Sequence, residues 1–453
     1  MSIRHLTPEI NSLPQEVSRY LNKYSLTGWE LESGDSYKIH MAVVIPAIGE
    51  YENIRSLLQS MVLNKRDCFN STLVIFVINN TSSSLEEIKT DNYSSVKLLR
   101  NIIKKEPSGD ALVNDVISSG LRLALVDASS EGKELPIKDG GVGLARKIGM
   151  DLALKIFSYN SPGKNILVCL DADCTIDTNY FTSIHNEFNG RNLDAAVVNY
   201  SHTLTGISDQ HDRAIICYEI FLRYYVLGLK IACSPYAFHT IGSTMACDHK
   251  SYMKIEGMNK RKAAEDFYFM EKLAKNTRIE SILSTTVYPS ARGSWRVPFG
   301  TGQRVNRFLS GMQDEYRLYS PQGFYVLKAW LKVFNDSLVH DSNYYLSHAQ
   351  QIHPALAEFL VLQGFEADWN RILVNSKIDT QINRQKMVWF DGFRTLKLIH
   401  YLRDNAFGPV NTFQALDEIF NYAGLPSDLR WESDCLPPLE IQLKYLHELR
   451  RNS

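Results

Sequence analysis

The sequence predicts an α/β fold, a mostly parallel sheet covered by helices, followed by a helical C-terminal region. From about residue 37 to residue 287, short β-rich runs alternate with segments of helical periodicity, as in a parallel sheet with crossover helices. After about residue 318, apolar residues recur at helical spacing and no convincing strand is visible. A chain of 453 residues also exceeds one average core. We therefore expect an N-terminal extension (1–37), an α/β domain (38–317) and a helical region (318–453).

Six β-rich runs are the expected strands. They cover residues 41–46, 72–78, 122–126, 165–170, 195–199 and 281–287. Apolar residues recur every three or four positions from Ile54 to Val62 and from Leu144 to Ile156, which predicts helices between the strands. Residues 79–117 are polar and poorly patterned. There we expect a long surface insertion with a helix or two, forming an extra subdomain or lid.

Composition indicates a globular protein without a nucleic-acid partner. The formal net charge is -1 and charged residues make up 22% of the chain, so no global field favours nucleic acid. The seven cysteines are scattered and odd in number, which favours reduced thiols and a cytoplasmic location. No signal peptide or transmembrane segment is evident, because the least polar stretch (214–232) contains Glu219, Arg223 and Lys230. We expect a helix packed on protein there; the alternative is peripheral contact with a membrane surface.

Paired acids follow the expected strand at 165–170. Asp171 and Asp173 are two residues apart, so on an extended backbone both carboxylates face the same side at the carboxyl edge of the sheet. Such a pair suits Mn²⁺ or Mg²⁺, which prefer carboxylate oxygen and also accept phosphate oxygens. The alternative is that these acids serve turns and helix caps. Asp177 is expected to be such a cap.

Two further segments suit a nucleoside diphosphate. In VVIPAIGEYENI (43–54), a buried strand ends at Pro46 and Ala47, and Glu50 is placed to bind a nucleoside or to cap the next helix. In KDGGVGLARKIG (138–149), a glycine-rich turn with Gly143 opens a helix that carries Arg146 and Lys147. Helix amides and cations bind phosphate, although a surface helix with two solvated cations is the alternative.

A third segment carries the most specific likeness. Residues 242–273 contain GSTMA and then the acids Glu265 and Asp266. In this order, the blocks over residues 38–310 resemble the family 2 glycosyltransferases, with their GT-A fold: PAxxE after the first strand, an Arg-bearing helix before the Asp-x-Asp strand, Gly-Ser-x-x-Ala, and Glu-Asp. The resemblance implies a hexosyltransferase-type enzyme that moves a sugar from a nucleotide-diphosphate donor to an acceptor hydroxyl with inversion.

The resemblance also implies that Asp266 is the general base, with Glu265 beside it. A carboxylate that takes the hydroxyl proton during attack contributes about 10²–10⁴-fold in rate. The alternative is that two acids at a helix start only complement its dipole. We expect the acceptor to be a saccharide, a lipid-linked molecule or another small molecule.

Three features extend the candidate site or depart from the family pattern. Asn79 and Asn80 stand where family members commonly have acids, and we keep them as candidate contacts to the donor. Residues 288–308 place Arg296 and Arg304 among aromatic residues, as in a loop that closes over donor or acceptor. The alternative for that segment is a basic connector. His239 and His249 are expected to be packed or capping residues and not metal ligands.

Three other functions remain as alternatives. A retaining glycosyltransferase of the same fold would not need Asp266 as a base. Sugar nucleotidyltransferases share the architecture, but they usually carry a glycine-rich loop with a basic residue directly after the first strand, where this chain has PAIGEYEN. A saccharide-binding scaffold without activity is disfavoured by the presence of both acidic motifs.

Overall fold

The computed structural model describes residues 13–34, 39–204, 206, 208–292, 300–311, 314–425, 429–431 and 435–453, and the backbone of residues 4 and 5. These residues form two compact units. The first unit holds the described residues of 1–203 and 240–290, and the second holds those of 204–239, 291–295 and 300–453.

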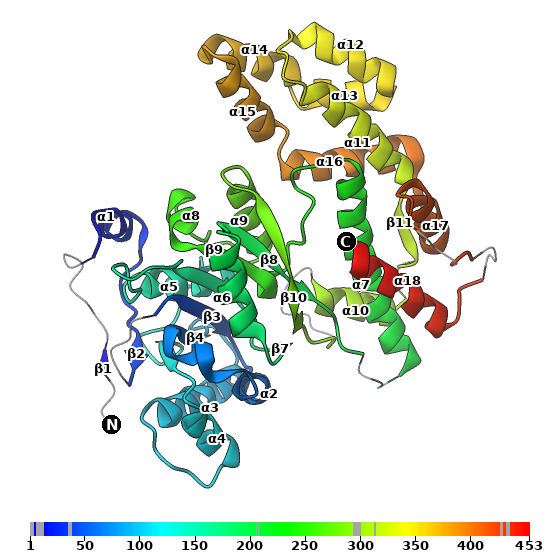
Figure 1. The fold of residues 1–453 in the computed structure, drawn as a ribbon. Helices are drawn as coiled ribbons and strands as arrows, with labels where there is room; N and C mark the ends of the chain where they lie inside the picture. Colours follow the sequence, from blue (N-terminus) through cyan, green and yellow to red (C-terminus); the bar gives the residue numbers. More distant parts are fainter. Residues whose placement is uncertain are drawn as a thin grey trace. The chain divides into compact units, whose positions relative to one another are not determined.

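The first unit is built on one ten-stranded sheet (Figure 1). In spatial order, its strands are β1 (Arg4–His5), β2 (Glu32–Ser33), β5 (Leu123–Ala128), β4 (Thr72–Asn79), β3 (Met41–Ala47), β6 (Ile166–Cys169), β9 (Met245–Asp248), β8 (Ala195–Tyr200), β10 (Ile279–Tyr288) and β7 (Thr175–Ile176). The four strands from β5 to β6 are parallel, as are β8 and β10. All six expected strands are present, and the predicted α/β fold class is confirmed.

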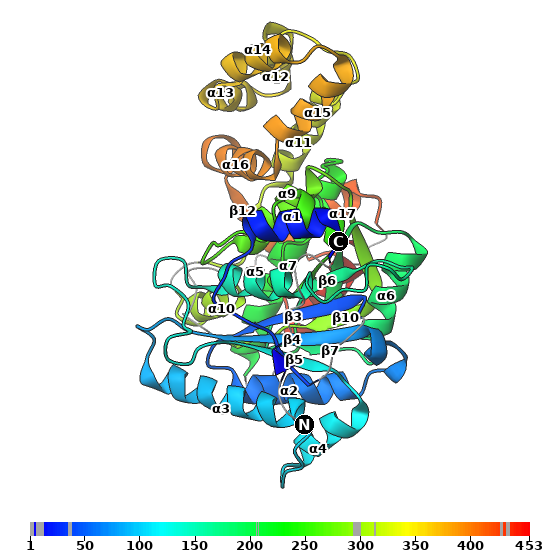
Figure 2. The same cartoon turned by 90° about the vertical axis from the view of Figure 1, so that its left-hand side faces the viewer.

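Helices cover both faces of this sheet (Figure 2). The first unit contains α1 (Gln15–Tyr24), α2 (Tyr51–Val62), η2 (Arg66–Ser71), α3 (Glu86–Ile103), α4 (Ala111–Ser119), α5 (Val142–Ala153), α6 (Tyr180–Gly190), η3 (Gly242–Thr244), α8 (His249–Lys254) and α9 (Glu265–Ala274). The apolar faces of α2, α3, α4 and α6 share one core with alternate residues of the strands. Helix α5 packs on the other face, where Gly149 lies so close to Val44 and Val77 that a Cβ would come within 2.4 Å of Val44.

The segment at 79–117 contains the helix or two that were expected, but it belongs to the core and is not a surface insertion. Helices α3 and α4 form the crossover between the parallel strands β4 and β5, and Val96, Leu99 and Val116 are buried against the sheet. The buried face of α3 also contains Asn92 and Ser95. These polar residues interrupt the apolar periodicity, which explains why the segment reads as unpatterned.

Strand β9 was not expected, because its four residues MACD are short and contain no β-branched side chain. It runs antiparallel between β6 and β8 and completes the centre of the sheet. Asp177 was expected to cap a helix, and that prediction is wrong. Its carboxylate accepts hydrogen bonds from the Thr286 backbone N–H (2.8 Å) and the Tyr288 hydroxyl (2.9 Å), and so it fixes the end of β10.

The second unit is helical, with one two-stranded sheet. It contains α7 (Asp209–Ile231), α10 (Thr301–Leu309), β11 (Arg317–Tyr319), α11 (Pro321–Phe334), α12 (Ser342–Ile352), α13 (Pro354–Leu362), α14 (Phe365–Asn375), α15 (Asp379–Trp389), α16 (Gly392–Leu402), η4 (Arg403–Phe407), β12 (Pro409–Asn411), α17 (Thr412–Tyr422) and α18 (Leu439–Asn452). An aromatic-rich core joins these helices, with Trp330, Phe334 and Trp369 fully buried. The helical C-terminal region is thus confirmed, and β12 is a strand that its sequence pattern did not show.

The unit boundary differs from the predicted division at residue 318. Helix α7 lies inside the range assigned to the α/β domain, yet it packs on α10, α11 and α18. Its buried Glu219 accepts hydrogen bonds from Arg223 on the same helix (2.8 Å) and from Arg450 on α18 (2.8 and 2.9 Å). The helix expected at 214–232 is therefore packed on protein. None of the helices that the structure describes has the length and apolar composition of a membrane span.

Candidate active site

Candidate site residues that follow three strands of the first unit lie at one edge of the sheet. Because β3 pairs in parallel with both β4 and β6, the carboxyl ends of these three strands meet at the same edge. The chain leaves β3 toward Glu50, leaves β4 through Asn79 and Asn80, and leaves β6 toward Asp171. The segments after β3, β4 and β6 therefore lie at the sheet edge where the sequence predicted a ligand.

Arg146 joins the two acidic motifs. From α5, its guanidinium donates to Oδ1 of Asp171 at the end of β6 and to Oε1 of Glu265 at the start of α9. The Arg146 side chain is only 2% exposed, and the two carboxylates raise the pKa of the guanidinium above its ordinary value. Gly242 of the GSTMA block makes room for it, since a Cβ there would lie 2.3 Å from Nη2 of Arg146. One buried cation thus places the Asp-x-Asp and Glu-Asp motifs in one site.

Asp266 lies beside this bridge and has an altered acidity. Burial, the negative charge of Glu265 and that of Asp171 raise the pKa of Asp266 to about 7, while Arg146 lowers it. The residue before the pair, Ala264, has a left-handed backbone (φ 56°), an uncommon conformation for a residue with a Cβ. Asn259 stabilises this turn by donating to the Glu265 carbonyl (2.8 Å). A carboxyl group that titrates near neutral pH is suited to take a proton.

Asp171 and Asp173 provide a fitting donor set for a divalent ion. Both are partly exposed after β6. They lie in a turn, in which the Cys174 N–H donates to the Asp171 carbonyl (3.2 Å), and not on the extended backbone expected from the sequence. Within the described part of the chain, no three His, Cys, Asp or Glu side chains gather as a complete metal centre. Two carboxylates nevertheless match the way Mg²⁺ is commonly held, with substrate phosphates and water supplying the remaining oxygens. Asp171 and Asp173 thus offer carboxylate oxygens of the kind that Mn²⁺ and Mg²⁺ prefer.

The glycine-rich turn has a packing role, and Lys147 pairs with Asp151 inside the protein instead of with a ligand. A Cβ on Gly143 would lie 2.4 Å from the Arg261 carbonyl oxygen, so this glycine allows α5 to approach the loop before Glu265. Lys147 is buried, with Nζ 3.0 Å from Asp151, and Tyr20 and Tyr252 also donate to Asp151 (2.9 and 2.8 Å). The expectation that Lys147 meets a phosphate is thereby corrected, because its charge is matched inside the protein.

The loop after β3 is fixed by α3. The N–H of Gly49 donates to the side-chain oxygen of Asn92 (2.9 Å), whose amide group donates to the Asn79 carbonyl (3.0 Å) and to Oδ1 of Asn80 (2.8 Å). The side chain of Asn79 in turn donates to the Ala47 carbonyl (3.0 Å). Asn79 and Asn80 thus hold the edge together, and Asn92 is a residue of the site that sequence reasoning missed.

Glu50 precedes α2 at this sheet edge, but its side chain makes no capping hydrogen bond to the helix backbone. It stands at the N-cap position of α2, and its carboxylate accepts a hydrogen bond from the side chain of Asn53. The neighbouring N–H of Tyr51 donates to Asp91 of α3 (3.0 Å). Pro46 and Ala47 are the last two residues of β3 and are buried. Hydrogen bonds from α3 thus hold the loop at the place where a nucleoside was expected.

The remaining candidates are two arginines and two histidines. Arg304 belongs to the second unit, where it pairs with Glu315, and Arg296 falls outside the described residues. His249 packs on Tyr159, with ring centres 5.4 Å apart, and burial lowers its pKa. Desolvation and the charges of Arg223 and Lys230 lower the pKa of His239 to about 3. His249 is thus a packed residue, one of the two roles expected for it.

Comparisons with known proteins give weak structural likenesses. The searches against protein-family models and curated proteins found no match. The chain is similar to residues 1–349 of S. aureus TarS in complex with UDP-GlcNAc, with 14% identity over 85% of this chain and 93% of that chain and a TM-score of 0.37. It is also similar to the mannosyltransferase PcManGT from Pyrobaculum calidifontis in complex with GDP-Man and Mn²⁺ (14% identity, 85% and 90% covered, TM-score 0.36).

A third similar structure is glucosyl-3-phosphoglycerate synthase from Mycobacterium tuberculosis, in complex with Mn²⁺, UDP and glucosyl-3-phosphoglycerate. Its identity to this chain is 11%, with 69% of this chain and 85% of that chain covered and a TM-score of 0.32. Likenesses at this level do not decide a function.

Proposed function

We propose that this protein is an inverting glycosyltransferase that moves a sugar from a nucleotide-diphosphate donor to an acceptor hydroxyl. The observation that carries the proposal is the bridge from Arg146 to both Asp171 and Glu265. It brings Asp171, one of the two carboxylates suited to a divalent ion, close to Asp266, a carboxyl group suited to proton abstraction. A nucleotide-sugar transferase needs both functions at one place.

Asp171 and Asp173 would hold Mn²⁺ or Mg²⁺ together with the diphosphate of the donor. When bound, the ion neutralises negative charge that develops on the departing nucleotide diphosphate. Arg146 keeps Asp171 in place by donating to one of its oxygens. The loop after β3, fixed by Asn92 at the same sheet edge, is the proposed place of the nucleoside.

Asp266 would take the proton from the acceptor hydroxyl as that oxygen attacks the sugar. The C–O bond to the acceptor forms while the bond from the sugar to the diphosphate breaks, so the anomeric centre inverts. Glu265 forms an ion pair with Arg146, and its negative charge beside Asp266 raises the pKa of Asp266, which favours proton uptake by that carboxylate. The two acids of the Glu-Asp pair therefore have different tasks.

Slow donor hydrolysis tests this proposal without knowledge of the acceptor. UDP-, GDP- and dTDP-sugars would be incubated with the protein, with and without Mn²⁺, and nucleotide diphosphate release measured. We expect hydrolysis of at least one donor in the presence of Mn²⁺ and its loss in Asp173→Asn. Asp194→Asn is a matched control, since Asp194 is a half-exposed acid of the same unit that pairs with Lys164 (2.9 Å).

Two results would contradict the proposal. One is the absence of Mn²⁺-dependent hydrolysis or binding for every donor class. The other is undiminished hydrolysis in the folded Asp173→Asn variant, because the proposed ion would then have lost a ligand without consequence.

A further inference from the structure

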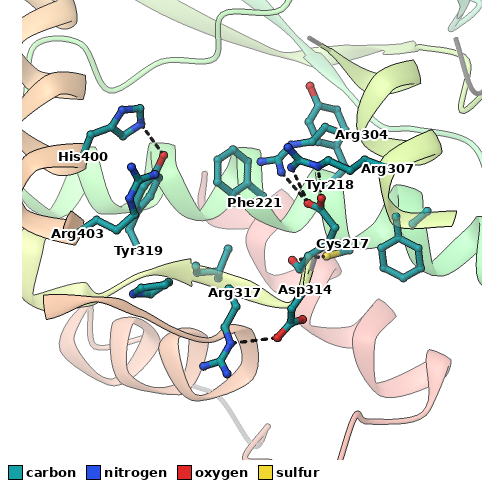
Figure 3. Close-up of a pocket in the computed structure, with 15 residues that line it drawn as sticks. Cys217, Tyr218, Phe221, Arg304, Arg307, Asp314, Arg317, Tyr319, His400 and Arg403 are labelled. Carbon is teal, nitrogen blue, oxygen red and sulfur yellow. Dashed lines mark hydrogen bonds and ion pairs between the residues drawn. The ribbon is translucent and has the colours of Figure 1, made fainter. Parts of the chain in front are cut away.

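The second unit contains a pocket of about 530 Å³ that the proposed reaction does not use (Figure 3). Helix α7 lines it with Cys217, Tyr218 and Phe221, and α10 lines it with Arg304 and Arg307. The rest of the lining comes from residues of β11, α16 and η4 and from the segments beside them. A pocket of this volume matches those that hold small molecules.

Two arginines of this pocket share one buried acid. Nη1 of Arg304 donates to Oε2 of Glu315 (2.6 Å), and Arg307 donates to both oxygens of the same carboxylate, through Nη2 at 3.0 Å and through Nε. The Glu315 side chain is 9% exposed, whereas those of Arg304 and Arg307 are 23% and 28% exposed. One carboxylate cannot balance two guanidinium groups, so the pair keeps a positive charge that reaches solvent.

The other charged residues of the lining do not cancel this excess. Arg317 pairs with Asp314 (3.1 Å), and Arg403 pairs with Asp404 (2.7 Å). Burial and the charge of Arg403 lower the pKa of His400, which leaves its ring neutral and hydrogen-bonded to the Tyr319 hydroxyl (2.8 Å). The net charge beside Arg304 and Arg307 therefore stays positive at neutral pH.

Aromatic rings accompany the cations on both sides of the pocket. The guanidinium of Arg304 lies 4.5 Å from the centre of the Phe221 ring, and that of Arg403 lies 5.9 Å from the centre of the Tyr319 ring. Stacking keeps a guanidinium in place while its N–H groups stay available in its plane. Each guanidinium has five N–H donors, of which Glu315 takes only a part.

We propose that this pocket binds a phosphate monoester carried on a sugar or polyol. The phosphate, with up to two negative charges, is held by the N–H groups of Arg304 and Arg307 that Glu315 does not occupy. The apolar side of the sugar or polyol lies against Phe221 and Tyr218. This inference is independent of the proposed transfer reaction, since it rests on residues of the second unit alone.

Calorimetry in EDTA tests the proposal while divalent ions are absent. The probes are glucose 6-phosphate, inorganic phosphate and glucose, and a second arm uses phosphatidylcholine vesicles with and without phosphatidic acid. We expect glucose 6-phosphate to bind, glucose to bind more weakly, and Arg304→Gln to weaken glucose 6-phosphate at least about tenfold, the loss that removal of a charged hydrogen-bond partner brings. Arg304-dependent binding of vesicles in place of glucose 6-phosphate would identify a lipid headgroup as the source of the phosphate.

Two further variants make the result decisive. Arg304→Lys keeps the charge beside Glu315 but loses the planar fork, so an intermediate loss is expected. Arg278→Gln is the matched control, because Arg278 is an 86% exposed arginine of the first unit that pairs with Glu280. The proposal is overturned if no phosphate probe binds the wild-type protein, or if Arg304→Gln, shown by circular dichroism to be folded, binds glucose 6-phosphate as the wild type does.

Discussion

The two units of this protein contain charge clusters of opposite design. In the first, one buried cation, Arg146, holds two acids, and further carboxylates stand beside them. In the second, one buried acid, Glu315, holds two arginines, and further arginines line the same pocket. In each cluster, one central residue binds two residues of opposite charge, so the first cluster keeps an excess of negative charge and the second an excess of positive charge.

The contrast indicates what each cluster can bind. An excess of carboxylate at a sheet edge favours a cation, and a metal ion with its phosphates is the partner such an edge takes most readily. An excess of guanidinium beside aromatic rings favours an anion with an apolar portion. The central residue of each cluster keeps like charges close enough to act together.

The largest expected effect is on the reaction at the acidic cluster. Asp266→Asn removes the proposed proton acceptor but keeps the size of the side chain, so the transfer rate should fall about 10²–10⁴-fold. The measurement is product formation with the donor and acceptor identified by screening. Mn²⁺-dependent donor binding should persist, and unchanged turnover would indicate a retaining mechanism or another base.

The next effect is on stability, when the centre of the acidic cluster is removed. Arg146→Met leaves Glu265 buried without its partner, and we expect the free energy of unfolding to fall by about 3–5 kcal/mol. Urea denaturation measures this change. The ion pair of the exposed Arg278 with Glu280 is the comparison, since Arg278→Met should cost at most about 1 kcal/mol. Equal effects of the two substitutions would contradict the role given to Arg146.

A smaller effect follows when the centre of the basic cluster is removed. Glu315→Gln leaves Arg304 and Arg307 facing a neutral amide, which should lower the free energy of unfolding by about 1–3 kcal/mol. The excess positive charge grows by one, so glucose 6-phosphate should raise the melting temperature of this variant more than that of the wild type. If glucose 6-phosphate did not raise the melting temperature of Glu315→Gln, the positive charge of Arg304 and Arg307 would not contribute to binding in this pocket.

The smallest expected effect is on the pH profile. Asp266 acts as a base only when ionised, and its pKa is raised to about 7, so kcat/KM should rise about tenfold between pH 6 and pH 8. Steady-state rates across this interval, with Mn²⁺ held saturating, are the test. The residual activity of Asp266→Asn should lack this rise, and a flat wild-type profile would refute the assignment of the titrating group.

Much of the fold could be predicted because its strands are apolar and its crossover helices are periodic. The strands at Met41–Ala47 and Thr72–Asn79 are buried throughout, as expected for parallel strands covered on both faces. The prediction failed for α3, where Asn92 and Ser95 lie on the buried face. It also missed β9, whose pairing with β6 and β8 is a long-range property that four residues cannot show.

The motifs of the candidate site could be predicted from the sequence, but the contacts between them could not. The order of the motifs placed Asp171 and Glu265 in one proposal, whereas the bridge between them is visible only in the structure. Arg146 and Lys147 looked equivalent in the sequence. Adjacent residues of a helix point in different directions, so one cation enters the acidic cluster while the other pairs with Asp151. Burial, which sequence alone does not give, decides between these roles.

The anchoring of the loop after β3 has a consequence for affinity and for selectivity among nucleosides. Because Asn92 and Asp91 already hold the backbone N–H groups of Gly49 and Tyr51, a ligand arriving at this loop loses little entropy to ordering it. A rigid loop also cannot change its shape to fit a different base. Discrimination among nucleosides at this loop would therefore come from steric exclusion of bases that do not fit.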